Sequence, residues 1–190
     1  MNVLDRPRCT WVNPKNPLYV KYHDAEWGQP LQHDVQHFEL LALETFVAGL
    51  SWETVLNKRE AFREAFDHFT PATVASYDDV DVSRLLNNPR IIRNRKKICA
   101  TISNAQVFLG VVNDYGSFDA YIWSFLNSDH PVHMDSNITI SPESTALAAD
   151  LKKRGIRFFG PTTAHSYLQA AGFVIAHSPG CYLSEKSLIL

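Results

Sequence analysis

The sequence predicts an all-α protein, on three observations. Apolar residues recur at helical spacing along most of the 190 residues. Helix start signals precede several of these segments: Ser51 is an expected N-cap, and Thr70-Pro71 places a capping threonine before a proline in the first turn. Sustained two-residue alternation, the signature of strands, is absent from the sequence. The length and the 45% hydrophobic content predict one globular domain, residues 1–190, with room for two helical lobes and a pocket between them.

The expected helices follow one another along the chain with short connections. The first is an apolar segment that starts after His33-Asp34 and has Gly49 near its end. With approximate bounds, the expected helices are 35–48, 51–68, 71–77, 79–87, 91–108, 117–127, 143–154 and 162–172. The proline-rich start, with Pro14 and Pro17, and the stretch 128–142 are expected to be irregular.

Composition and charge exclude several classes of protein. No apolar run approaches the ~18 residues of a membrane span, and the N-terminus lacks the apolar stretch of a signal peptide. Cys99 has no evident partner in the sequence, so we expect no disulfide framework and a reducing cytoplasm. The net charge of −2 implies no general affinity for polyanions, so a nucleic-acid site must be a local patch. A monomer without membrane contact is expected.

Two pairs of potential metal ligands lie at opposite ends of the chain. Cys9 and His23 are near the start, and His177 and Cys181 are near the end. Two thiolates and two imidazoles suit a tetrahedral zinc ion, and one ion bound by all four would tie the termini together. Four protein ligands leave no position for a reacting water, so such a zinc would be structural. The alternative is a set of core histidines and two buried free thiols.

Glu44 lies in the most apolar of the expected helices. Leu40 and Ala48 are one turn away on either side, and Leu41 and Val47 are three residues away. The pattern therefore predicts a buried carboxylate, which is costly unless it is paired or hydrogen-bonded. One interpretation is a structural pair with an arginine, and the other is an acid that lines an apolar pocket.

Aromatic residues gather around the same parts of the sequence. Trp11, Tyr19, Tyr22 and Trp27 flank the first ligand pair, and Trp52 follows the helix of Glu44. Such residues commonly form a core. A carboxylate surrounded by aromatic rings also suits a flat, cationic ligand such as an altered nucleobase, through stacking and cation–π attraction.

A basic segment surrounds Asn87-Asn88-Pro89, an expected turn between two helices. It contains no acidic residue, and its cations are Arg84, Arg90, Arg93, Arg95, Lys96 and Lys97. A helix–hairpin–helix presents backbone N–H groups and a helix start to a DNA phosphate, whereas the alternative is a solvated basic face. A second basic group, Lys152-Lys153-Arg154 with Arg157, could extend the DNA-binding surface.

Several short segments carry a resemblance to a known family. They are Arg8–Val12, Tyr22–Gly28, Ala48–Leu56, Ile91–Arg95, Leu151–Gly155 and Phe159–Thr163. In this combination and order, the sequence resembles DNA-3-methyladenine glycosylase I, a branch of the helix–hairpin–helix DNA glycosylases. The resemblance implies a compact helical glycosylase fold and a repair enzyme that flips 3-methyladenine out of alkylated double-stranded DNA and hydrolyses its N-glycosidic bond.

The resemblance also implies roles for individual residues. It implies a structural zinc on Cys9, His23, His177 and Cys181, and a base-binding pocket built from Glu44, Tyr22, Trp27 and Trp52, with Trp11 and Tyr19 nearby. We expect Arg90, Arg93 and Arg95 of the basic segment to contact DNA. The broader superfamily's catalytic aspartate is not retained in this family, so Asp135 receives no such role.

The sequence departs from the family pattern at a few positions. Arg90 replaces a glycine of the hairpin, where it could contact phosphate with its own side chain. His165 replaces an aromatic residue, and Ala176 replaces an acidic residue before the last histidine. The segment before Ser141 is short and lacks a tryptophan.

The chemistry of the lesion determines what Glu44 is expected to do. Methylation at N3 makes adenine cationic and weakens its glycosidic bond, so a general acid is not required. An ionised Glu44 would accept a hydrogen bond from the exocyclic amino group and offset the positive charge, while Trp52 stacks on the base. Two alternatives remain open: a non-catalytic binder of alkylated DNA that uses the same pocket, and a zinc hydrolase, which would need an open metal position.

Overall fold

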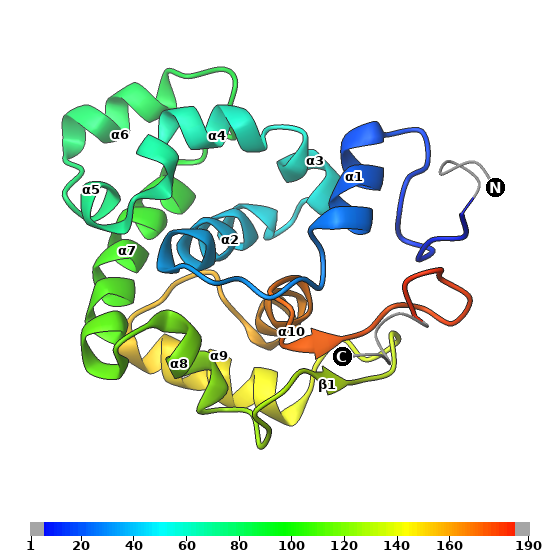
Figure 1. Cartoon of the computed structure of the whole chain (residues 1–190). Coiled ribbons are helices and arrows are strands. Elements are labelled where there is room, and N and C mark those ends of the chain that lie inside the picture. Colours follow the sequence, from blue (N-terminus) through cyan, green and yellow to red (C-terminus); the bar gives the residue numbers. More distant parts are fainter. Residues whose placement is uncertain (1–5, 185–190) are drawn as a thin grey trace.

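The computed structural model describes residues 6–184 and consists almost entirely of helices (Figure 1). In chain order the elements are α1 (Pro17–Ala25), α2 (Asp34–Val47), α3 (Trp52–Leu56), α4 (Arg59–Ala65), η2 (Asp67–Phe69), α5 (Pro71–Ala75), α6 (Asp79–Leu86), α7 (Arg95–Tyr115), α8 (Phe118–Trp123), β1 (Val132–His133), α9 (Pro142–Arg154), α10 (Pro161–Ala170) and β2 (Val174–Ile175). The predicted all-α class is confirmed, with a minimal sheet added to it. Among the described residues, each helix is too short or too polar to traverse a lipid bilayer.

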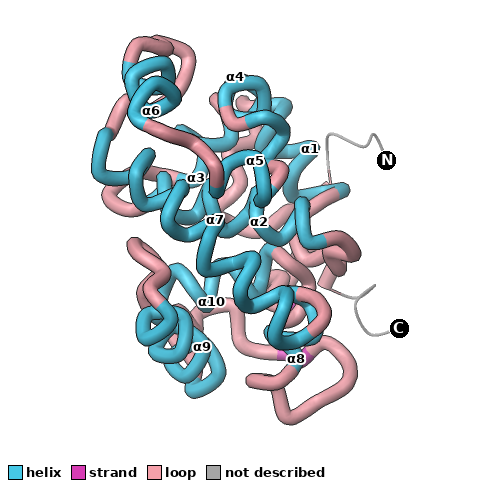
Figure 2. The backbone as a smooth tube through the Cα atoms, turned by 90° about the vertical axis from the view of Figure 1, so that its left-hand side faces the viewer, coloured by secondary structure: helices cyan, strands magenta, loops and turns pink. Residues whose placement is uncertain are grey.

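Helices α2 and α7 form the centre of the fold. In Figure 1, α4, α5 and α6 lie above α2 and α8, α9 and α10 lie below it, while α7 runs along one side and contacts both groups. Figure 2 views the molecule from that side. Phe38 of α2 packs edge-on against Phe108 of α7, with ring centroids 5.3 Å apart. A side chain on α2 is therefore held between two groups of helices.

Lys97, in the first turn of α7, fixes the C-terminal end of α2. Its ammonium group donates hydrogen bonds to the carbonyl oxygens of Phe46 and Ala48, at 2.7 and 2.6 Å. Carbonyl groups at this end of a helix lack partners within the helix, and a cation there complements the helix dipole. The contact ties the start of α7 to the helix that carries Glu44.

The predicted helix 51–68 is interrupted. Ser51 caps its start as expected, but the chain runs as α3, α4 and η2 rather than as one helix. The backbone of Asp67–Phe69 is left-handed, with φ between 49 and 54°. Phe69 is fully buried and stacks on Phe66 with ring centroids 5.6 Å apart, so burial of this ring offsets the strained backbone. Apolar spacing continues through the turn, which is why periodicity did not reveal it.

The proline-rich start was predicted to be irregular and instead contains α1. The side-chain oxygen of Asn16 accepts hydrogen bonds from the backbone N–H groups of Leu18 and Tyr19. Pro17 occupies the first helical position, where its missing N–H costs nothing. Asparagine followed by proline is thus a helix start here, and it orders the segment that carries Tyr19 and Tyr22.

The prediction that the chain lacks strands was wrong for the four residues of β1 and β2. Within the stretch 128–142, β1 pairs in parallel with β2, with Val132 opposite Val174 and His133 opposite Ile175. Strands of two residues are too short to leave an alternating pattern in the sequence. The pair anchors the chain just before the second pair of predicted metal ligands.

The helix predicted at 91–108 is shifted toward the C-terminus. It begins at Arg95, where the side chain of Asn94 accepts a hydrogen bond from the N–H of Lys97. It ends at Tyr115, and Gly116 then adopts φ +85°. Residues 87–94 therefore form the connection between α6 and α7, which is longer than the predicted turn.

Candidate functional site

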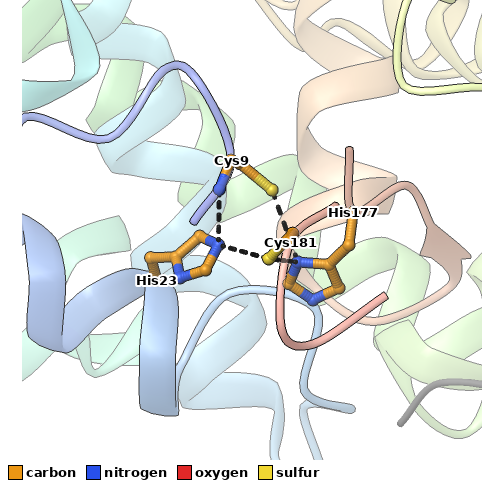
Figure 3. A group of neighbouring side chains, drawn as sticks. All are labelled: Cys9, His23, His177 and Cys181. Carbon is orange, nitrogen blue, oxygen red and sulfur yellow. Dashed lines mark hydrogen bonds between the residues drawn. The ribbon is translucent and has the colours of Figure 1, made fainter. Parts of the chain in front are cut away.

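The two ends of the chain meet in a cluster of the four predicted metal ligands (Figure 3). One ligand atom from each of Cys9, His23, His177 and Cys181 lies within 4.8 Å of the others. The Cys9 sulfur is 3.5 Å from His177 Nδ1, and the Cys181 sulfur is 3.5 Å from His23 Nε2 and 3.7 Å from His177 Nδ1. Tetrahedral bonds of ordinary Zn–S and Zn–N length place sulfur and nitrogen about 3.6 Å apart. The cluster could therefore hold a metal ion.

Neighbouring groups orient these ligands. His23 Nδ1 lies 2.9 Å from an Asp24 carboxylate oxygen, which leaves Nε2 to face the sulfurs. Arg8 holds Asp24 in turn, through hydrogen bonds of 2.8 and 2.6 Å. The backbone N–H of Ser178 donates to the Cys9 sulfur at 3.3 Å. A carboxylate behind a ligating imidazole and a donor to a thiolate are usual surroundings of a metal site.

Burial keeps the side chains of the cluster neutral unless a cation is bound. Burial raises the pKa of the Cys9 thiol to about 11, and burial lowers the pKa of His177 to about 4, aided by the neighbouring His23. The imidazole is thus neutral and able to ligate, whereas the thiol needs a nearby positive charge to ionise. With all four ligands facing inward, no position is left for a reacting water, which argues against the zinc-hydrolase alternative.

A pocket of about 190 Å³ lies beside the cluster and contains every residue predicted to bind a base. Tyr19 and Tyr22 come from α1, Glu44 from α2 and Trp52 from the start of α3. The complete lining is Trp11, Tyr19, Tyr22, Trp27, Glu44, Val47, Trp52, Ser166, Gln169 and Ala170. The structure therefore brings together residues from the first 52 positions and from α10.

Glu44 is the acidic residue of this pocket, and it is only 6% exposed. Burial raises the pKa of its carboxyl group to about 8. Among residues 6–184, no hydrogen-bond donor or cation reaches the carboxylate, so the structural pair with an arginine is not formed there. Arg59 and Arg63 bind Glu26 and Glu39 instead. The carboxylate can therefore interact with a ligand.

Aromatic contacts connect the pocket with the cluster. Trp11 packs against His23 and Trp27 with centroids 5.3 and 5.0 Å away, and Trp27 packs edge-on against His177 at 4.7 Å. Among the other lining residues, the rings of Tyr22 and Trp52 are 5.2 Å apart. The wall formed by Trp11 and Trp27 thus rests on two of the ligand histidines, and an ion in the cluster would also stabilise the pocket.

Sequence reasoning missed the contribution of α10. Ser166 and Gln169 lie three residues apart on this helix and face the pocket with small Ala170. Polar residues at this spacing in the expected helix 162–172 were the available signal. His165, the residue that departs from the family pattern, is buried and lies 3.2 Å from the Gln169 amide, outside the lining itself.

The three arginines predicted to contact DNA are not equally available to a phosphate. The Arg90 guanidinium forms an ion pair with Glu64 at 2.5 Å, although both side chains are exposed. Arg95 is 3.7 Å from Asp79, a looser pair. Within the described part of the chain, the exposed Arg93 has neither an ion pair nor a side-chain hydrogen bond. Arg93 is therefore the arginine of the three best placed to meet a phosphate.

Asp135 lies outside the pocket. Its carboxylate accepts hydrogen bonds from the backbone and side chain of Asn137, at 2.8 and 2.9 Å, and closes a local turn. This placement agrees with leaving Asp135 without a catalytic role.

Comparison with known proteins identifies the family. A sequence model described as methyladenine glycosylase matches residues 11–184. DNA-3-methyladenine glycosylase 1 of Escherichia coli (strain K12) is 43% identical over 178 residues, covering 92% of this chain and 95% of that protein. A crystal structure of 3-methyladenine DNA glycosylase I superposes with a TM-score of 0.87 at 44% identity, covering 93% of this chain and 98% of that one. A variant of such an enzyme in complex with 3-methyladenine gives 0.86 at 41%, over 92% and 96%. The chain belongs to the methyladenine glycosylase family.

Proposed function

We propose that this protein is a DNA-3-methyladenine glycosylase that acts on alkylated double-stranded DNA. The observation that carries the proposal is Glu44, a carboxylate buried in an aromatic pocket and without a partner among residues 6–184. The solved structure of a similar enzyme, 41% identical to this chain, is a complex with 3-methyladenine. The pocket supplies what a methylated adenine needs, namely a negative charge for its positive ring and aromatic rings for its flat faces.

The raised pKa of Glu44 links binding of the lesion to its charge. With a pKa of about 8, the carboxyl group is mostly protonated near neutral pH when the pocket is empty. A cationic base favours the ionised form, so the proton leaves as the base enters. The carboxylate then accepts a hydrogen bond from the exocyclic amino group of adenine, where guanine would present a carbonyl oxygen. Glu44 thereby selects the adenine lesion.

The lesion itself supplies much of the driving force for bond cleavage. Methylation at N3 leaves a positive charge on the base, and departure of the base from the sugar neutralises that charge. The enzyme must therefore extrude the nucleotide, hold it and position the sugar for attack by water. Tyr22, Trp52 and Trp27 line the pocket and can hold the flat ring of the base. Removing Glu44 should slow excision without abolishing it.

We infer that the metal is zinc and that its role is structural. Cys9, His23, His177 and Cys181 would hold it, and the inward-facing two-sulfur, two-nitrogen donor set is the combination that zinc prefers. The ion supplies positive charge that stabilises two thiolates. Because Trp11 and Trp27 pack on the ligand histidines, the closed cluster would brace one wall of the base pocket.

Binding to the duplex is assigned to the connection 87–94 and the start of α7, with Arg93 contacting phosphate and Arg95 in support. Arg90 contributes less, because Glu64 already neutralises its charge. These contacts position the protein without reading sequence. A monomer suffices, since every group in the proposed mechanism comes from one chain, and the free cysteines favour the cytoplasm.

Base release from methylated duplex DNA tests the proposal. Wild-type protein should release 3-methyladenine, detected by chromatography, whereas Glu44→Gln should release it more slowly but above the uncatalysed rate. Glu39→Gln is the matched control, since Glu39 lies on the same helix but is paired with Arg63. Tight binding of methylated DNA without release by the wild type would favour the non-catalytic binder instead.

A further inference from the structure

Phe158 has a backbone conformation that a bulky residue rarely adopts. Its φ is +58°, in the left-handed region, where a β-carbon crowds the following carbonyl oxygen. It lies in the connection between α9 and α10, and 41% of its surface is exposed. A strained residue persists only where its surroundings hold it in place, and such residues gather at functional sites.

Burial does not explain this strain. In Asp67–Phe69, where other non-glycine residues adopt left-handed φ values, the backbone conformation places Phe69 in the core. Around Phe158 the pattern is reversed: Ile156 and Phe159 are buried, and the ring between them is directed outward. The conformation therefore presents an aromatic ring to the solvent.

Hydrogen bonds from a buried side chain of α7 hold the connection between α9 and α10 in place. The fully buried side chain of Asn104 accepts a hydrogen bond from the backbone N–H of Arg157 at 2.9 Å and donates one to its carbonyl oxygen at 3.1 Å. The Asn104 amide also lies 3.5 Å from the hydroxyl of Thr45, the neighbour of Glu44 on α2. The peptide that precedes Phe158 is thus fixed to the helix that carries the pocket acid.

The surroundings of Phe158 suit a polyanion. Arg157, Lys152 and Lys153 are exposed, and none of them has an ion pair within residues 6–184. In Figure 1 the connection crosses from α9 past α2 to the start of α10, the helix whose Ser166 and Gln169 line the pocket. An exposed ring next to unpaired cations near a base pocket matches a nucleic acid better than an apolar protein partner.

We propose that Phe158 is a DNA-contacting residue that stacks against a base of the duplex next to the extruded nucleotide, with Arg157 meeting the adjacent phosphate. The proposal rests on the proposed function, since it takes damaged duplex DNA as the partner. An aromatic face can stack on any base, so the contact is independent of sequence. A ring held in a fixed position can fill space in the base stack without first being ordered, which lowers the cost of binding.

Glycine at this position separates a DNA contact from a structural role. Phe158→Gly removes the ring and also relieves the left-handed backbone, so thermal stability should be unchanged or higher. Affinity for a duplex with an abasic site, measured by fluorescence anisotropy, should fall about 5- to 150-fold, the range measured for loss of one base–aromatic stack. Affinity for free 3-methyladenine should not change, because Phe158 is outside the pocket lining.

Two further variants complete the experiment. Phe158→Trp should retain duplex affinity, since a larger ring still stacks, and Val35→Ala, with the same 41% exposure elsewhere on the surface, should bind as the wild type does. Unchanged duplex affinity in Phe158→Gly would overturn the proposal, as would a loss of its thermal stability, which would show a structural role. If the wild type releases no base but still depends on Phe158 for duplex binding, only the proposed function fails.

Discussion

The metal cluster and the Glu44 pocket are two buried polar sites only one aromatic layer apart, yet they are completed differently. In the cluster, four ligand atoms face one another within 4.8 Å. In the pocket, one carboxylate faces aromatic rings without a donor among the described residues. The first arrangement is closed around its own centre and suits a permanent ion. The second is open and suits a ligand that enters and leaves.

The cluster suggests how the fold can keep an acid buried in the pocket without a partner of its own. A buried carboxylate destabilises the protein that carries it, so the structure around it must be held by other means. Trp11 and Trp27 form part of the pocket and also pack on the ligand histidines His23 and His177. The cluster would thus stabilise the wall beside Glu44. This stabilisation would offset the free-energy cost of burying the Glu44 carboxyl group.

The largest expected effect comes from opening the cluster. Cys181→Ser removes one thiolate, so zinc content should fall together with the free energy of unfolding, which should drop by more than about 4 kcal/mol because metal binding is coupled to folding. Elemental analysis and thermal unfolding on the same sample measure both. Cys99→Ser, outside the cluster, is the control. A metal-free wild type of full stability would contradict the metal assignment.

The second effect comes from titrating the pocket acid. In the unfolded chain Glu44 ionises near pH 4.5, whereas the folded protein keeps the proton up to about pH 8. The native state therefore binds more protons in this window, and its stability must fall as pH rises through it. The loss should be about 2 kcal/mol between pH 6 and pH 8.

Comparison with Glu44→Gln isolates this titration. Glutamine does not ionise, so the variant should lack the decline, and the difference between the two unfolding profiles should grow steadily with pH. Chemical denaturation at a series of pH values provides the profiles. Parallel profiles for both proteins would mean that the Glu44 carboxylate is already satisfied in the folded state.

The smallest effect is expected for the arginines near the connection 87–94, which are exposed, unlike the groups of the two buried sites. Arg93→Ala should lower duplex affinity and reduce the salt slope of binding by about 0.9, the contribution of one phosphate contact. Arg90→Ala should change both less, because Glu64 holds that guanidinium. Glu64→Gln should raise duplex affinity by freeing Arg90. Equal slopes for wild type and Arg93→Ala would place the phosphate contact elsewhere.

Sequence patterns predicted the pocket better than they predicted its scaffold. The apolar spacing around Glu44 correctly indicated burial, and residue type alone suggested the four-ligand cluster that the fold brings together. Neither required knowledge of distant contacts. The α10 residues Ser166 and Gln169 were missed because their approach to α1 and α2 depends on tertiary packing, and their polar spacing alone does not show which face of α10 meets the pocket.

Two of the backbone errors have a common cause. The interruption at Asp67–Phe69 and the strand pair β1–β2 involve contacts with residues far along the chain, such as Phe38 for Phe69 and Val174 for Val132. The pairing of Arg90 with Glu64 is of the same kind, since 26 residues separate them. The start of α7 was a local signal that was overlooked, because asparagine is a favoured N-cap and the Asn94 side chain accepts a hydrogen bond from the N–H of Lys97.

Calorimetric titration with free 3-methyladenine decides whether Glu44 is the ligand-binding acid of this pocket. Wild-type protein should bind the base, with proton release near neutral pH as Glu44 ionises. Glu44→Gln should bind it more weakly, by about 1.5 to 3 kcal/mol, the contribution of a hydrogen bond to a charged group. Equal affinity and equal proton release in the two proteins would show that Glu44 is a structural acid and that the base binds elsewhere.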